Sequence, residues 1–463
     1  MFISVPDTLE YLIIGCLLII CFLTSDMRAQ TSPGQMKPNI IFIMADDLGY
    51  GDLGCYGQQQ IQTPHIDRLA AEGTRYTQVY AGATVCAPSR SCLMTGTHGG
   101  HTRVRDNIPH GVFLQPDDVT IAEVLKKAGY VTGGIGKWSL GNPGSWGVPL
   151  YQGFDEFFGH LNQDQAHFYY PDYLWDNEKV KLLFGNRGGE RKEYTHDLFT
   201  ERALDFITRQ KQKHFFLYLA YTIPHFSDYD QQSPLSQIVP SDEPYTNKDW
   251  PQVEKNYAAM VTRMDTDVGR IMVLLQDLGI DSNTIVFFTS DNGPCACCAH
   301  QVEFFDSNGS LRGVKREVYE GGIRVPMIVR WPGRIPAGRT SQTVWAFWDV
   351  MPTLEELAGL PPSKAIDGIS YLNDLLGKKQ NRRHDYFYWD YGHVRDTYMQ
   401  AVRSGKWKSV KRGVSAPIEL YDLDNDTGEM NDLAGSHPDI VLKLQEMMRE
   451  AYVPSADYPI GGF

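Results

Sequence analysis

The chain has 463 residues, of which 42% are hydrophobic and 21% charged, so it can bury a large core and is not a disordered or low-complexity protein. Its 43 Lys and Arg against 56 Asp and Glu give a formal net charge of −13. That charge argues against nucleic acid or an anionic membrane as a partner. An anionic ligand would need a local cluster of cations.

The first 30 residues have the pattern of a secretory signal peptide. Residues 11–25 carry no charge, and the aliphatic run 12–23 is too short to span a bilayer. We therefore expect a signal over residues 1–30, export to the periplasm or the medium, and no stable membrane insertion. Two alternatives stay open, namely a lipoprotein attached through Cys16 and a retained short anchor.

Two predicted strands end in pairs of polar side chains. The apolar runs 39–45 and 284–290 are typical of buried parallel strands, and they stop at Asp46-Asp47 and Asp291-Asn292. One such pair alone would more often be a helix cap or a turn. Two pairs predict an oxygen-rich site for a hard divalent cation, Ca²⁺ by preference and Mg²⁺ as the alternative.

Cys86 opens the segment Cys-Ala-Pro-Ser-Arg, which Ser-Cys-Leu-Met-Thr-Gly follows. Pro88 suits the first turn of a helix, so we expect a helix to start here and to place Cys86 at its positive end. A cysteine phosphatase loop would need an arginine at the position of Cys92, whereas the nearby arginine is Arg90. The pattern favours a nucleophile over an ordinary buried cysteine.

Further strands are predicted at 130–135, before Lys137, and at 215–221, before His225. Apolar residues have helical spacing at 121–128, 195–209 and 257–278. The alternation predicts an α/β fold in which a large, mostly parallel sheet lies between helices. Ligands of such sheets bind beyond the carboxyl ends of the strands, so these polar side chains should meet in one cleft.

Beyond residue 377 the pattern changes. A basic stretch, 378–384, precedes short antiparallel strands and an amphipathic final helix, predicted at 386–389, 398–403, 407–410 and 440–452. We therefore divide the chain into a catalytic domain over 37–377 and a small C-terminal antiparallel α+β subdomain over 378–463.

The cysteine count is eight. Without the two in the signal and Cys86, five remain, so they cannot all pair with one another. Cys295, Cys297 and Cys298 lie near His300, but no second ligand cluster accompanies them. A local disulfide or a loop thiol group is favoured over a zinc site.

From residue 38 to about 433 the chain resembles the type I sulfatases of the alkaline phosphatase superfamily, especially arylsulfatase-like and N-acetylgalactosamine-6-sulfatase-like members. The matching motifs are the Cys86 segment, residues 46–51, Gly-Lys137-Trp, Ile-Pro-His225, Ser-Asp-Asn-Gly at 290–293, residues 312–326 and the tail 419–423. The resemblance implies an alkaline phosphatase-like sheet. It also implies that a formylglycine-generating enzyme oxidises Cys86 to formylglycine (3-oxoalanine).

The resemblance also implies roles for the matching side chains. Calcium would be bound by Asp46, Asp47, Asp291, Asn292 and the modified Cys86. Arg90 would orient the formylglycine hydrate, Lys137 and Lys315 would hold the sulfate oxygens, and His225 would protonate the leaving alcohol. One hydroxyl of the hydrate would attack sulfur, and the aldehyde would re-form as sulfate leaves.

One position departs from the family, because Ser139 stands where many sulfatases have a histidine. The segment 159–171 is rich in histidine, amide and aromatic groups, which suit sugar binding. We expect its His167, rather than His160, to serve in substrate binding or proton transfer. The alternative is an aromatic-rich surface loop.

These observations predict an exported sulfatase that acts on a sulfated carbohydrate, with a galacto-configured sugar favoured by the resemblance. Two other functions stay open: a phosphonate monoester or phosphodiester hydrolase on the same scaffold, and a catalytically silent sugar-binding relative. Lys137, Lys315 and His225 together favour the sulfatase over the first. The intact Cys86 and Arg90 argue against the second.

Overall fold

The computed structural model describes residues 37–108, 111–228, 233 and 235–461. Residues 37–463 form one compact unit, and the predicted boundary at 378 stays a prediction. The predicted signal, with Cys16, lies outside the described residues. Among the helices of the described ranges, none combines the length and the apolar character needed to cross a membrane.

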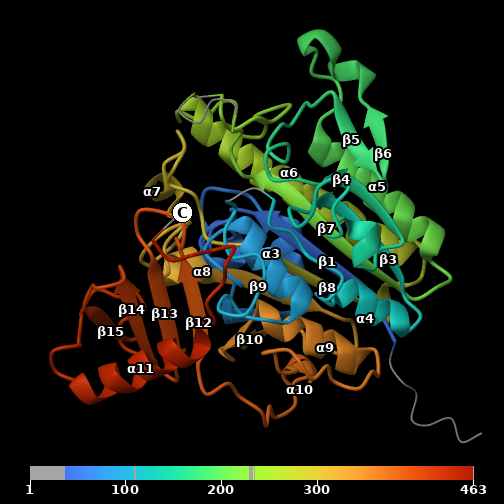
Figure 1. Cartoon of the computed structure of the whole chain (residues 1–463). Coiled ribbons are helices and arrows are strands. Elements are labelled where there is room, and N and C mark those ends of the chain that lie inside the picture. The colour runs from blue at the N-terminus through green and yellow to red at the C-terminus, as the bar shows by residue number, and fades with distance from the viewer. Residues whose placement is uncertain (1–36, 109–110, 229–232, 234, 462–463) are drawn as a thin grey trace, which may run out of the picture. The chain divides into compact units, whose positions relative to one another are not determined.

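A large twisted sheet forms the centre of the fold (Figure 1). Its strands run in the order β10-β2-β9-β8-β1-β7-β3-β4-β5-β6, and β11 also pairs with β2. Their bounds are Asn39–Asp46 (β1), Thr74–Tyr80 (β2), Val131–Lys137 (β3), Glu156–His160 (β4), Tyr173–Asp176 (β5), Lys179–Leu182 (β6), Phe215–Pro224 (β7), Thr284–Ser290 (β8), Arg324–Arg330 (β9), Arg339–Ser341 (β10) and Trp345–Ala346 (β11).

The middle of this sheet is parallel, as predicted. Strand β1 pairs in parallel with β7 and β8, and β3 pairs in parallel with β7 and β4. Every residue of β1, β7 and β8 is buried, because their continuous runs of Ile, Phe, Leu and Val fit a strand covered on both faces. Antiparallel pairs flank this centre, namely β8 with β9, β9 with β2, β4 with β5 and β5 with β6.

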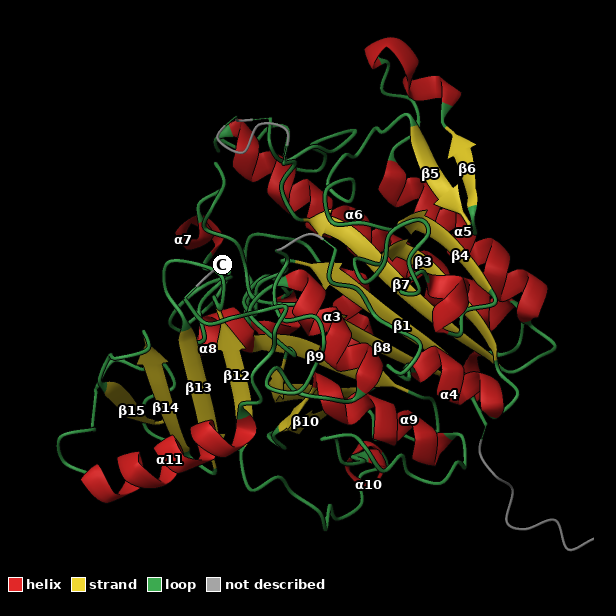
Figure 2. Cartoon of the chain, in the orientation of Figure 1, coloured by secondary structure: helices red, strands yellow, loops and turns green. Residues whose placement is uncertain are grey.

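Helices cover both faces of the sheet (Figure 2). One layer contains α2 (Pro64–Ala71), α5 (Thr195–Gln210) and α6 (Gln252–Asp277), of which α2 and α5 both contact α6. The other contains α3 (Cys86–Thr95), α4 (Ile121–Lys127), α9 (Val350–Leu357) and α10 (Leu372–Leu375). Short elements complete the large unit: α7 (Val302–Phe305), α8 (Glu320–Ile323) and 3-10 turns at Gly54–Tyr56, Pro149–Gln152, Phe184–Gly189, Asp281–Asn283 and Phe347–Asp349.

A second sheet of four antiparallel strands follows, in the order β12-β13-β14-β15, and α11 packs on it. The bounds are Phe387–Tyr391, Met399–Ser404, Trp407–Arg412, Ile418–Asp422 and, for α11, Pro438–Ala451. The small antiparallel α+β arrangement predicted for this part of the chain is therefore confirmed. Within the described ranges the structure also forms one local disulfide, Cys295–Cys297, and leaves Cys298 free.

Candidate active site

The site begins where β1 and β8 end. These strands are neighbours, with Ala45 opposite Ser290, so the residues that follow them meet. The Asp47 backbone N–H donates to Asp291 Oδ1 at 3.2 Å, and Asn292 Nδ2 donates to Asp47 Oδ1 at 2.7 Å. Asp46, Asp47, Asp291 and Asn292 are all buried. The structure thus brings together both strand-end pairs predicted from the sequence.

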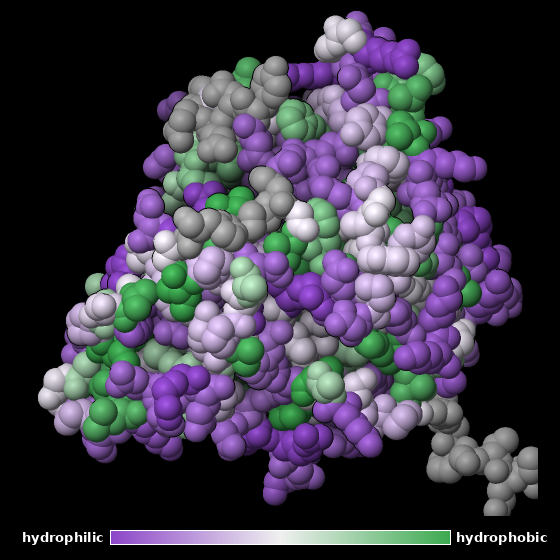
Figure 3. Space-filling model, in the orientation of Figure 1, coloured by the Kyte–Doolittle hydropathy of each residue, from purple (hydrophilic) through white to green (hydrophobic). Residues whose placement is uncertain are grey.

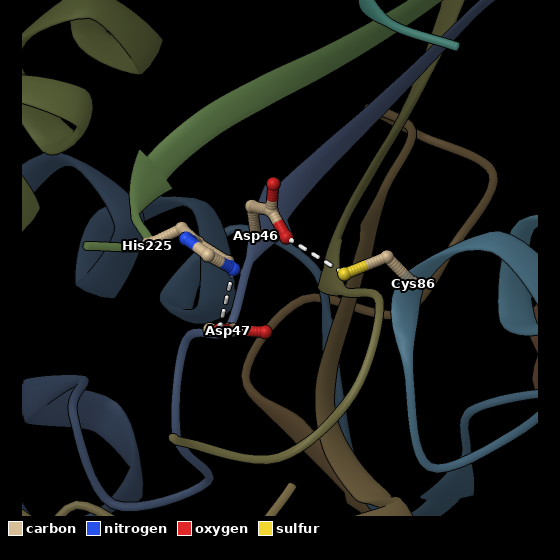
Figure 4. Close-up of side chains that lie close together, drawn as sticks. All are labelled: Asp46, Asp47, Cys86 and His225. Carbon is tan, nitrogen blue, oxygen red and sulfur yellow. Dashed lines mark hydrogen bonds and ion pairs between the residues drawn. The ribbon is translucent and has the colours of Figure 1, made fainter. Parts of the chain in front are cut away.

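Cys86 is the first residue of α3, where the helix dipole is positive. Its Sγ lies 3.4 Å from Asp46 Oδ1 (Figure 4). Asn107 Oδ1 accepts from the Ala87 N–H at 3.0 Å, so a side chain from outside the helix satisfies one of the exposed N–H groups. Ser89, one turn on, donates to the Asp291 carbonyl at 2.6 Å and fixes the helix to the end of β8.

Arg90 is fully buried and holds three parts of the site in register. Its Nε and Nη2 donate to Asp291 Oδ2 at 3.1 and 2.7 Å. Its Nη1 donates to the Lys137 carbonyl at 2.8 Å, at the end of β3. A guanidinium with its donors fixed in this way is a rigid positive charge beside Cys86.

Two lysines form matching pairs with the two aspartates and with two histidines. Lys137 Nζ lies 2.7 Å from Asp46 Oδ2 and 3.0 Å from His167 Nε2. Lys315 Nζ lies 2.8 Å from Asp47 Oδ2 and 3.0 Å from His225 Nε2. The segment 159–171 therefore brings His167 to the site.

The two imidazole rings stack, with centroids 3.4 Å apart and an interplanar angle of 6°. His225 Nδ1 contacts the Phe226 carbonyl at 2.7 Å, and His167 Nδ1 contacts the Asp228 carboxylate. Carbonyl and carboxylate oxygens only accept hydrogen bonds, so Nδ1 carries the hydrogen in both rings. The Nε2 lone pair of each ring then faces a lysine ammonium.

The buried charges shift one another's pKa. Burial, aided by the Asp46 carboxylate, raises the pKa of the Cys86 thiol to about 12, so the unmodified side chain is a protonated thiol and a weak nucleophile. Burial and the nearby His167 and Lys315 lower the pKa of His225 well below its usual value, so this imidazole is neutral. Although burial alone would lower it, the Asp46 carboxylate raises the pKa of Lys137.

The acidic groups fit a divalent cation. Ligand atoms of Asp46, Asp47, Cys86 and His225 all lie within 4.8 Å of one another. Asn292 Oδ1 is buried and has no hydrogen-bond partner in the described part of the chain, which is the state of an oxygen that a cation would satisfy. Burial and the Asp46 carboxylate raise the pKa of Asp291 to about 6, a direction that a nearby cation would reverse. Oxygen ligands of this kind suit Ca²⁺ or Mg²⁺.

Three further residues near the site extend or limit what the sequence predicted. His160 is fully buried in β4, and neither ring nitrogen has a hydrogen-bond partner among the residues that the structure describes. Asp228, which contacts His167, escaped sequence analysis, although a carboxylate three residues after a strand-end histidine was a usable signal. Ser139 is buried with φ 68°, and its Oγ forms no hydrogen bond with any described residue.

The fold and the site define a hydrolase of anionic esters: buried strand-end acids, a helix-start Cys86 and three cationic side chains meet at one edge of an α/β sheet. Comparison with known proteins narrows the class. The model of the Sulfatase family matches residues 38–360, and that of the N-sulphoglucosamine sulphohydrolase C-terminal region matches residues 313–453. The chain belongs to the sulfatase family, whose members are sulfuric ester hydrolases.

Individual relatives cover most of the chain. N-acetylgalactosamine-6-sulfatase of Canis lupus familiaris is 35% identical over 423 residues, 85% of this chain and 75% of the relative. N-acetylgalactosamine-6-O-sulfatase of Bacteroides thetaiotaomicron is 31% identical over 505 residues, 91% and 95% of the two chains. Among solved structures, Ps i-CgsB in complex with k-i-k-neocarrahexaose has a TM-score of 0.76 at 27% identity, over 92% of this chain and 95% of that one.

Proposed function

We propose that the protein is an exported sulfatase that hydrolyses sulfate esters of saccharides, using a formylglycine made from Cys86 and a bound Ca²⁺. The observation that carries the proposal is the meeting of Cys86 with two lysine–histidine pairs and four buried strand-end ligands. The N-acetylgalactosamine-6-sulfatases and the neocarrahexaose complex support a sulfated saccharide as substrate. The uncharged run 11–25 supports export.

The two lysines are suited to hold a sulfate group. An ammonium has three donors, and each lysine uses one on an aspartate and one on a histidine. The third donor of Lys137 and of Lys315 is left for a sulfate oxygen. Arg90 adds a fixed charge beside residue 86, and fixed charges of this kind stabilise the developing negative charge of a transition state.

The two histidines are suited to move protons. Nδ1 of His225 already carries a hydrogen, so a proton given to the leaving alcohol must be one taken up at Nε2, beside Lys315. His167 stands in the same relation to Lys137, and its Nδ1 contacts the Asp228 carboxylate. We assign His225 to the leaving alcohol and His167 to the substrate or to residue 86.

A formylglycine hydrate would supply a hydroxyl nucleophile that a buried thiol cannot, and a cation would stabilise charge on the attacking and sulfuryl oxygens. Asp46, Asp47, Asp291 and Asn292 would hold the cation. Arg90 balances the excess of carboxylates through its bonds to Asp291.

Mass spectrometry of residue 86 tests the proposal. Trypsin cuts after Arg90 and separates Cys86 from Cys92. In protein from a host with the maturation enzyme, the Cys86 peptide should be lighter by the thiol-to-aldehyde difference, while the adjoining Cys92 peptide keeps its cysteine mass. Active enzyme that contains only unmodified Cys86 would contradict the mechanism.

Turnover of matched aryl substrates separates the sulfatase from the phosphodiester and phosphonate alternatives. We expect a higher kcat/KM for an aryl sulfate than for an aryl phosphodiester or phosphonate with the same leaving group. The reverse order would reassign the reaction. A panel of defined sulfated mono- and oligosaccharides would then identify the sugar.

A further inference from the structure

A second cleft lies away from Cys86, between the β10 edge of the large sheet, the α10 segment and the start of the small sheet. Its volume is about 560 Å³, within the range of roughly 300–1,000 Å³ that is typical of ligand sites. Strands β9 and β2 separate β10 from β8, whose end carries Asp291. Three steps of about 4.8 Å place β10 roughly 14 Å to the side of β8.

The side chains that line this cleft are mostly basic, whereas the whole chain is acidic. Among its sixteen residues, one is acidic, Asp374, and five are Lys or Arg, namely Arg339, Lys378, Lys379, Arg383 and Arg403. The whole chain, in contrast, has a formal charge of −13. Charges of one sign gathered in a concave site concentrate counter-ions there.

The inner arginines are already fixed by protein partners, in contrast to the outer cations. Arg339 donates to the Asp374 carbonyl at 2.6 Å and to Asp374 Oδ1 at 2.9 Å. Arg403 contacts the Tyr80 hydroxyl and donates to Gln78 Oε1 at 2.6 Å. The three outer cations, Lys378, Lys379 and Arg383, are exposed and form no ion pair with any described residue.

The remaining lining indicates the kind of anion. Thr340 and Gln342 are exposed and offer hydroxyl and amide groups, which match sugar hydroxyls. The aromatic rings of Tyr371 and Phe387 are 2% and 7% exposed, so they offer no platform on which nucleic acid bases could stack. Hydrophilic residues also dominate the face drawn in Figure 3, including its lower edge.

We propose that this cleft is a second binding site, which holds a segment of a sulfated saccharide chain while the sulfatase site acts elsewhere. Lys378, Lys379 and Arg383 pair with sulfate groups, and the neutral side chains contact the sugar. The site adds affinity for a polymer and leaves the chemistry at residue 86 unchanged. The choice of a sulfated saccharide as the occupant rests on the proposed function, whereas the inference itself concerns binding alone.

The test compares two triple variants of the full chain. Lys378→Ala/Lys379→Ala/Arg383→Ala removes the free cations of the cleft. Its control, Lys211→Ala/Lys213→Ala/Lys443→Ala, removes three equally exposed charges elsewhere. The Kd is measured for immobilised chondroitin sulfate and heparin, with hyaluronan, inorganic sulfate and duplex DNA as competitors, and aryl sulfate turnover is recorded for each protein.

We expect the cleft variant to bind a sulfated polysaccharide at least ~tenfold more weakly than the wild type, with a flatter salt dependence, and the control to stay within about twofold. Aryl sulfate turnover should be equal in all three. Equal Kd values for the two variants, or no binding of either polysaccharide by the wild type, would overturn the site. Complete competition by low millimolar inorganic sulfate, or equal competition by DNA, would overturn the saccharide assignment. If the wild type did not hydrolyse the aryl sulfate at all, the proposed function would be refuted instead.

Discussion

At the scale of single residues, the Asp291 carboxylate accepts hydrogen bonds from two different parts of the buried site. One of its oxygens receives the Asp47 backbone N–H, and the other receives Nε and Nη2 of Arg90. The same carboxylate is a predicted cation ligand. Without this carboxylate, the Arg90 guanidinium would lose its main hydrogen-bond partner, and the cation beside Asp46 and Asp47 would lose one of its predicted ligands.

We therefore expect Asp291→Ala to abolish sulfatase activity, to lower Tm and to reduce bound Ca²⁺. Asp281→Ala is the control, since Asp281 lies just before β8, at its other end, and forms a bidentate pair with the buried Arg330. Its loss should lower Tm and have no effect on the bound metal. Elemental analysis and calorimetry check both variants, and an active, calcium-loaded Asp291 variant would refute the metal assignment.

His167 is a second residue at which geometry makes a specific prediction. Its Nε2 lies 3.0 Å from Lys137 Nζ, whereas His160 is buried in β4 and has no described partner for its ring nitrogens. We expect His167→Ala to lower kcat on the sulfated saccharide by about 10²- to 10⁴-fold, the usual loss for a proton-transfer group.

Formylglycine conversion and calcium content should stay unchanged in this variant. The control, His160→Ala, should retain kcat per folded molecule even if the cavity lowers its Tm. Normal turnover by the His167 variant would show that the segment 159–171 is a scaffold only.

At the scale of elements, the end of β3 is set by a close backbone approach. Gly136 has φ 100°, and a Cβ at this position would lie 1.9 Å from the Ala220 carbonyl oxygen in β7. A side chain must therefore push β3 away from β7. Lys137, the next residue, would move with it.

Gly136→Ala should therefore lower both stability and turnover. A displacement of about 1 Å at the sulfate-binding lysine is enough for a roughly hundredfold loss of kcat. Gly144→Ala separates strain from displacement, because Gly144 has φ 84° but no neighbouring atom within 4 Å of the position that a Cβ would take. An L-residue at this positive φ is strained, so Gly144→Ala should lower the free energy of unfolding by about 1–2 kcal/mol and leave kcat unchanged. Equal kcat losses in the two variants would show that the close approach is irrelevant.

The elements that sequence analysis predicted best are those that are buried on both sides. The continuous apolar runs 39–45 and 284–290 fit a central strand that is covered on both faces. The ends of these strands, followed by Asp46-Asp47 and Asp291-Asn292, could therefore be located to within one residue. Strands β5 and β6 escaped prediction because β5 is only partly buried and β6 is exposed, so neither contains a continuous apolar run. The position of Asp228, three residues after His225, was a local signal, but its contact with His167 depends on the tertiary path of two loops.

At the scale of the whole molecule, a buried ion cluster joins the small four-stranded sheet to the part of the chain that contains the large sheet. Lys408 on β14 is fully buried, with its Nζ 2.8 Å from Glu320 Oε1 on α8 and 2.9 Å from Glu429 Oε1. The Glu320 backbone N–H also donates to Glu429 Oε2 at 2.7 Å. The Lys408 ammonium therefore lies between two carboxylates, of which Glu320 also pairs with Arg324 at 3.3 Å.

Lys408→Met should destabilise the fold without touching the active site. The methionine fills much of the same volume, but it leaves Glu320 and Glu429 facing each other without the ammonium between them. Breaking a buried pair in this way typically costs about 3–5 kcal/mol. Urea unfolding should show this loss of stability. At urea concentrations below the unfolding transition, kcat on an aryl sulfate should stay normal. Lys411→Met, on the same strand and without a described ion pair, should change stability by less than about 1 kcal/mol. Equal stability of the two variants would mean that packing, and not this ion cluster, joins the small sheet to the large unit.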